Sequence, residues 1–177
     1  ASPTASLDSS AGTPNTSAAD TTTVATAGAG TTVKFTQTAF NTGNASDTVN
    51  LTAALGTFPA GTTFKFFAAD GLTPLIDNNS DGTVDTGPST AGGILNFLLA
   101  PTLPWPTTIP TGPFSAIVTG TSTGDSSKSE TTRDTLTSMV GVLVDLTNSA
   151  SGNGTAGNTG SGDVGGGGAP APRGTMR

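Results

Sequence analysis

The sequence predicts an all-β protein, and three observations support that prediction. Thr accounts for 36 of the 177 residues, and Thr and Val both favour strands. Glu and Lys, which usually cover helix surfaces, are almost absent, and Gly and Pro are frequent. Apolar and polar residues alternate through about seven short runs separated by Gly- and Pro-containing turns, the pattern of a Greek-key β-sandwich.

Alternation marks the expected strands in chain order. Residues 21–26 form the first candidate strand, and 31–40 form the second, with Val33, Phe35, Gln37 and Ala39 on one face. The further candidates are 47–55, 62–68, 94–99, 114–121 and 136–146, with turns at 41–44 and 58–61. Residues 101–113 contain five Pro residues, so we do not expect a central strand there.

Composition divides the chain into three zones. Residues 1–19 are an extended polar N-terminal segment, 20–146 form the β-sandwich domain, and 147–177 are a Gly/Ser/Asn-rich tail. Both end zones have the composition of flexible linkers. An ordered stretch within them would have to be held by pairing onto a sheet, in its own subunit or in a neighbouring one.

Three consecutive stretches resemble the Ig-like repeat domains of bacterial and archaeal cell-surface proteins. They are VKFTQTAFNTGN at 33–44, SDTVNLT at 46–52 and FPAGTTF at 58–64. The family reads strand, Asn-Thr-Gly-Asn turn, strand, Leu-Pro-Ala-Gly turn, strand, and Phe58 stands where the family usually has Leu. The resemblance covers residues 31–146. It implies a seven-stranded Ig-like sandwich in a secreted, cell-surface or appendage protein, and no catalytic residues.

Missing residue types exclude most enzyme chemistry. The chain has no His, Cys or Tyr, so an imidazole base, a Ser-His-Asp triad and thiolate or imidazole metal sites are excluded. A net charge of −6 without a basic cluster argues against nucleic acid as a partner. The longest apolar runs, 94–100 and 139–146, are too short for a membrane helix. We therefore expect an extracellular protein that is not an enzyme.

Oxygen donors recur at alternate positions of the segment 77–85, DNNSDGTVD. Such spacing brings side chains to one point when a loop coils around Ca²⁺, and Gly82 at the sixth position permits the turn. The sequence therefore predicts a structural calcium site, with Asp70 as a possible additional ligand. The alternative is that Asn, Asp and Gly simply make turns. The expected ligands are Asp77, Asn79, Asp81, Thr83 through its carbonyl, and Asp85.

Two other segments have both a functional and an ordinary interpretation. Trp105 in the Pro-rich stretch could stack on a sugar or a partner surface, but covering one end of the sandwich is the favoured interpretation. The charged stretch 125–134 contains Ser, Lys and Glu, and a solvated hairpin loop is favoured over a nucleophile with helpers.

Two functions remain open at this stage. The favoured one is a structural subunit of an extracellular homopolymer (a pilus-like filament, fibre or surface layer) that assembles by donating a terminal strand to a neighbour. The alternative is a calcium-dependent adhesin or carbohydrate-binding module that recognises surface glycans. The segment with the most strand-like composition near a terminus is the expected donor: Thr21, Thr22, Thr23, Val24, Ala25 and Thr26.

Overall fold

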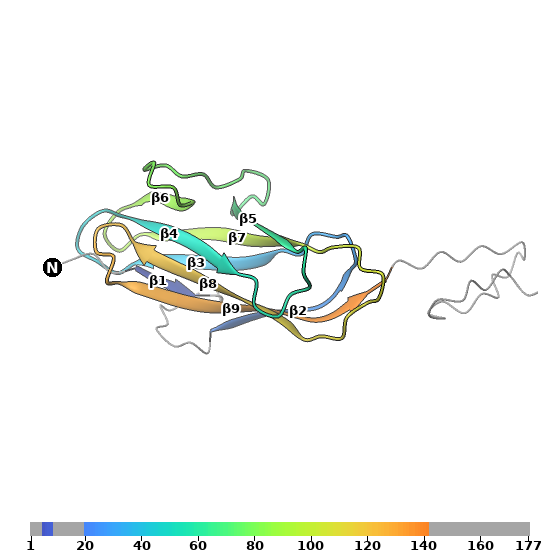
Figure 1. The fold of residues 1–177 in the computed structure, drawn as a ribbon. Coiled ribbons are helices and arrows are strands. Elements are labelled where there is room, and N and C mark those ends of the chain that lie inside the picture. Colours follow the sequence, from blue (N-terminus) through green and yellow to red (C-terminus); the bar gives the residue numbers. More distant parts are fainter. Residues whose placement is uncertain (1–4, 9–19, 142–177) are drawn as a thin grey trace, which may run out of the picture. The chain divides into compact units, whose positions relative to one another are not determined.

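The computed structural model describes residues 5–8 and 20–141, and in these residues the chain forms nine strands and no helix (Figure 1). The smaller sheet has the order β1 (Ala5–Asp8), β3 (Phe35–Asn41), β7 (Ile94–Thr102), β5 (Thr63–Ala68). The larger sheet has the order β2 (Thr21–Gly28), β9 (Ser129–Val140), β8 (Phe114–Ser122), β4 (Asp47–Ala54), β6 (Asp85–Ser89). The predicted all-β sandwich is confirmed.

The hydrophobic core lies between the two sheets. Phe35, Phe97 and Leu99 of the smaller sheet and Val118 and Leu136 of the larger sheet are fully buried. The expected inward face of the strand at 31–40 is also correct, since all four of its residues are buried. Burial of these side chains, at about 1.5–3 kcal/mol each, is the main favourable contribution to the fold.

Two strands were not expected from the sequence. β1 lies in the N-terminal segment 1–19 and pairs antiparallel with β3, in the way we expected an ordered terminal stretch to be held. β6 lies at the end of the predicted calcium loop and pairs antiparallel with β4. It contains Gly87 and Pro88, which are tolerated because β6 is an edge strand.

The prediction of a loop at 125–134 is wrong for residues 129–134. β9 begins at Ser129 and pairs with β8 from Ser129 to Leu136, so only the residues before it form the turn. The core positions in this part of β9 are occupied by polar residues, Thr132 and Asp134, which are both buried. Alternation of apolar residues therefore gave no signal for a strand there.

The first two residues of the Pro-rich segment, 101 and 102, belong to a central strand, contrary to the prediction. β7 is a central strand and continues through Pro101 to Thr102. Pro101 lacks only its N–H, and its carbonyl still accepts a hydrogen bond from the Val33 N–H at 2.9 Å. Residues 103–113 form no strand, as expected.

One compact unit ends at Val140. Residues 142–146, the end of the last predicted strand, and the tail 147–177 lie outside the described residues. Within the described part of the chain, no helix has the length and hydrophobicity needed to cross a membrane.

Candidate functional site

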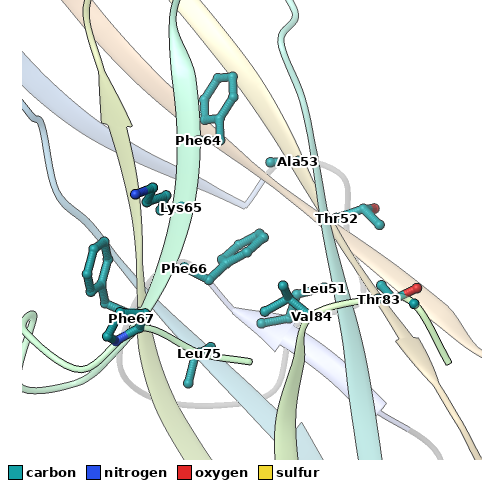
Figure 2. Close-up of a pocket in the computed structure, with 12 residues that line it drawn as sticks. Leu51, Thr52, Ala53, Phe64, Lys65, Phe66, Phe67, Leu75, Thr83 and Val84 are labelled. Atoms are coloured by element: carbon teal, nitrogen blue, oxygen red, sulfur yellow. The ribbon is translucent and has the colours of Figure 1, made fainter. Parts of the chain in front are cut away.

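An apolar groove of about 740 Å³ opens between β4 of the larger sheet and β5 of the smaller sheet (Figure 2). It is lined by residues 51–53 of β4, residues 64–67 of β5, and residues 74, 75 and 82–84 of the connection between β5 and β6. Leu51 and Phe66 are core residues, 2% and 9% exposed. Figure 2 shows Phe66 pointing toward Leu51 and Val84, so the floor of the groove is the hydrophobic core itself.

The β4 side of the groove is an open sheet edge. β6 pairs with β4 only as far as Asn50, and the Leu51 N–H then donates to the carbonyl of Val84 at 2.8 Å. Backbone N–H groups two residues apart point the same way in a strand, so the N–H of Ala53 also points toward the groove. Among the described residues no strand pairs with this side of β4 beyond Leu51.

The β5 side is a second open edge. β5 pairs with β7 on one side, and on the other the Leu75 N–H donates to the Phe66 carbonyl at 2.9 Å. Two residues earlier, the peptide groups of Phe64 face the same outer side, and within the described region no strand pairs with them. The Phe64 ring lies edge-on to Phe58, with 5.7 Å between centroids, which holds it in place at the groove.

One charged side chain, Lys65, belongs to the groove lining. Figure 2 shows Lys65 and Phe67 on the opposite side of β5 from Phe66, as strand alternation requires. Apolar residues in the strands were predicted from sequence, but the groove was not. The groove exists because β6 ends before the end of β4. The residue pattern of β4 does not indicate how far its neighbouring strand extends.

Hydrogen bonds from its own side chains hold the loop with calcium-type spacing, residues 77–85, in a coiled conformation. Asp77 accepts hydrogen bonds from the N–H groups of Asp81 and Gly82, at 3.2 and 2.8 Å. Asp81 accepts from the Thr83 N–H at 2.9 Å and from the side-chain amides of Asn50 and Asn79. The hydrogen bond from Asn50 is the main cause that lowers the pKa of Asp81 below its ordinary value.

Asp85 makes different contacts from those of the other predicted ligands. Its carboxylate is fully buried and accepts hydrogen bonds from the backbone and side-chain N–H groups of Asn78, both at 2.7 Å, and from the Gly87 N–H. It thereby closes the loop at the start of β6. A role in binding Ca²⁺ would have to replace some of these hydrogen bonds.

No group of three or more acidic side chains that could hold a metal ion forms among residues 5–8 and 20–141. Asp70 caps the turn after β5, accepting from the N–H groups of Leu72 and Thr73 and from the Thr73 hydroxyl. These hydrogen bonds, the hydroxyl first, lower the pKa of Asp70 to about 2. The predicted calcium site, with Asp77, Asn79, Asp81, Thr83 and Asp85 as ligands, stays a prediction.

The predicted assembly segment Thr21–Thr26 lies within β2. It pairs in parallel with β9 of its own chain, from Thr21 opposite Arg133 to Gly28 opposite Val140. β2 is an edge strand of the larger sheet, so its outer side is free of any strand in the described structure. Donation of this segment to a neighbour stays a prediction, and it would exchange this pairing for the same pairing in another copy.

Trp105 lies in the connection between β7 and β8 and is 69% exposed. Its indole lies against Gly30, where a Cβ would be 2.0 Å from the ring. Gly30 has a φ of 72° and donates its N–H to the Pro104 carbonyl at 3.1 Å. One side of the ring is therefore covered at this end of the sandwich, and most of the ring faces solvent.

A buried polar network crosses the core, and sequence reasoning missed it. The Gln37 amide of β3 donates to both carboxylate oxygens of Asp134 in β9, at 2.7 and 2.8 Å. The Thr132 hydroxyl donates to the Gln37 side-chain oxygen at 2.8 Å. Burial raises the pKa of Asp134 to about 7, and the Gln37 hydrogen bond opposes that shift.

Comparisons with known proteins bear on the fold alone. No family model and no curated protein matches the chain. Among solved structures, it is similar to the ASH/PapD-like domain 7 of human CEP192, with a TM-score of 0.47 and 10% identity over 80% of this chain and 89% of that one. The N-terminal domain of PorA matches with a TM-score of 0.49 and 13% identity over 75% and 96%.

A domain of the secreted serine protease VesC from Vibrio cholerae is also similar, with a TM-score of 0.38 and 11% identity. The match covers 64% of this chain and 21% of VesC. The two-sheet β-sandwich itself is established by the strand order of the described residues. The resemblance of residues 33–64 to surface-protein repeats stays a prediction.

Proposed function

We propose that this protein is a structural subunit of an extracellular filament, fibre or surface layer, and that copies of it join by strand addition. The observation that carries the proposal is the apolar groove between β4 and β5, bordered by two sheet edges. An added strand gains main-chain hydrogen bonds from an open edge and buries its alternate side chains in the pocket below. Few charges protect these edges, and edge charges are what normally prevents such pairing.

The composition supports an extracellular location and a non-catalytic role. Residues with charged side chains make up 10% of the chain, and His and Cys are absent. The proposed partner is a second copy of the chain, and neither nucleic acid binding nor membrane insertion is part of the proposal. A head-to-tail contact of this kind does not close on itself, so it propagates into a polymer.

The proposal is tested by electron microscopy and light scattering on the purified full chain over a range of concentrations. Ordered polymers that grow with concentration are expected. Deletion of residues 1–26, which include the sequence-predicted donor, provides the second arm: soluble monomers are expected if that segment is the donor. A full chain that stays monomeric at every concentration contradicts the proposed function.

Exposure of Trp105 supports the second candidate function, a calcium-dependent adhesin or carbohydrate-binding module. A tryptophan ring covered on one side by Gly30 and 69% exposed offers a flat apolar surface, which is what stacking on a sugar ring requires. Glycan binding by the monomer that is lost in Trp105→Ala or on chelation favours this candidate. Unchanged binding in Trp105→Ala removes the support.

A further inference from the structure

We infer that residues 142–146 of one copy, Val-Leu-Val-Asp-Leu, add as a β-strand to the groove between β4 and β5 of a second copy. The inference rests on the proposed assembly by strand addition and names both its acceptor and its donor. It replaces Thr21–Thr26 as the donated segment.

The acceptor offers backbone and apolar surface together. Ala53 directs its backbone N–H, and Phe64 its peptide groups, toward the groove from opposite sides. Between these two edges lie Leu51, Phe66 and Val84, which are apolar and belong to or pack against the core. A strand placed there covers the exposed side of the core, and where it pairs with β5 it extends the smaller sheet.

The donor has the matching pattern. Its alternate residues Val142, Val144 and Leu146 are all apolar and branched, and on a strand they share one face. With that face toward the groove, three apolar side chains meet its apolar floor. Leu143 and Asp145 then face outward, so the one charge of the segment stays in water.

The charges beside the groove agree with this orientation of the donor strand. Lys65 is exposed on the outward side of β5 and is the one charged residue of the groove lining. It has no ion pair within the described residues. A donor strand beside β5 places Asp145 on the same outward side as Lys65, where opposite charges on neighbouring strands favour pairing by about 0.2–1 kcal/mol.

Covalent reach favours a second copy as the source of this strand. β9 ends at Val140, and the groove lies beyond β8 and β4 in the strand order. Three strand spacings amount to about 14 Å. The two residues from Val140 to Val142 span at most about 7 Å, so the first residue of the segment cannot enter the groove of its own chain.

Donation of the alternative segment, Thr21–Thr26, has an energetic cost within its own subunit. Thr21–Thr26 forms register pairs with β9 along its length in its own chain, and donation would first break them. Its side chains are also mostly Thr and exposed or half-buried, with Val24 as the one branched apolar residue. It therefore matches an apolar groove less well than residues 142–146.

Disulfide trapping tests the contact directly, because the natural chain has no Cys. Two differently tagged full chains are mixed under mild oxidation, one carrying Ala53→Cys in the groove and the other Val144→Cys in the donor. Efficient formation of the mixed dimer is expected. The matched control is Thr36→Cys, which is exposed on β3, mixed with the same Val144→Cys chain.

A pair of substitutions in the donor tests its orientation. Val144→Asp places a carboxylate against the apolar floor and is expected to weaken association about a hundredfold. Leu143→Asp makes the same chemical change on the outward face and is expected to weaken it far less. Neither residue lies in the strands that the structure describes, and urea unfolding of both variants shows whether the sandwich stays folded.

The outcomes of these experiments distinguish the inferred donor, the alternative donor and the proposed function. A mixed dimer no more abundant than the Thr36→Cys control, or equal effects of the two Asp substitutions, overturns the inference. Polymers that persist in Val144→Asp but vanish on deletion of residues 1–26 overturn it in favour of the Thr21–Thr26 donor and leave the proposed function intact. A wild-type chain that never associates overturns both.

Discussion

At the scale of single residues, the most informative group is the buried carboxyl of Asp134. It lies between the sheets with no cation beside it in the described structure, and the Gln37 amide is its hydrogen-bond donor. A buried charge without a counter-charge is costly. Burial therefore raises the pKa of Asp134 to about 7, and the folded protein holds a proton that the unfolded chain has already released.

The pH dependence of stability follows from that shift. Between pH 4 and 7 the folded state binds more protons at Asp134 than the unfolded state, so the contribution of Asp134 to stability is largest below pH 4 and is lost as the pH rises toward 7. The full shift corresponds to at most about 4 kcal/mol. Urea unfolding of wild type and Asp134→Asn across this range measures it. A difference between the two proteins that does not change with pH contradicts the shift.

The calcium prediction is also made at the residue scale. Calcium at a hundredfold excess over its dissociation constant should stabilise the fold by about 2.7 kcal/mol. This gain should disappear in Asp81→Asn, because Asp81 is a predicted ligand in the coiled loop. Asp125→Asn in the turn before β9, outside the predicted ligand set, is the matched control and should keep the gain. A Tm that is unaffected by millimolar calcium contradicts the site.

At the scale of elements, β7 shows which features of a strand its sequence could predict and which it could not. Its apolar run predicted a buried strand, and Phe97 and Leu99 are buried. Ile94, in the same run, is 57% exposed because strand alternation turns it, like Asn96, to the opposite face of the sheet from Phe97 and Leu99. Apolar content marks a strand, but it does not tell which of its residues lie beneath the second sheet.

Two substitutions in β7 measure that difference. Phe97→Ala should destabilise the fold by about 3–5 kcal/mol, since it leaves a cavity between the sheets. Ile94→Ala, in the same strand, should cost less than about 1 kcal/mol because the side chain is mostly in water. Chemical denaturation gives both values, and similar losses for the two would contradict the assignment of the core.

The sequence predicted most strands because Val and Phe alternate in them, and it failed where polar residues take core positions. Thr132 and Asp134 are buried in β9, and their pattern reads as a solvated loop. β6 was missed because it is short and contains Gly87 and Pro88. The coiled loop at 77–83 could be predicted from local spacing, whereas the groove depends on where two distant strands end.

At the scale of the whole molecule, the sandwich leaves its side between β4 and β5 incompletely covered. The chain also carries an apolar alternating segment, 142–146, beyond its last described strand. The proposed assembly joins these two features, because an open sheet edge can accept an added strand from another chain. The low charge of the chain is consistent with this function, since charges on edge strands would oppose it.

Copies of the chain are proposed to associate by strand addition. Sedimentation velocity of the wild-type chain and of Val144→Asp, over the same range of concentrations, tests it most directly. Wild type is expected to form growing oligomers, while Val144→Asp is expected to remain monomeric. Wild type that sediments as a monomer at every concentration would contradict assembly by strand addition.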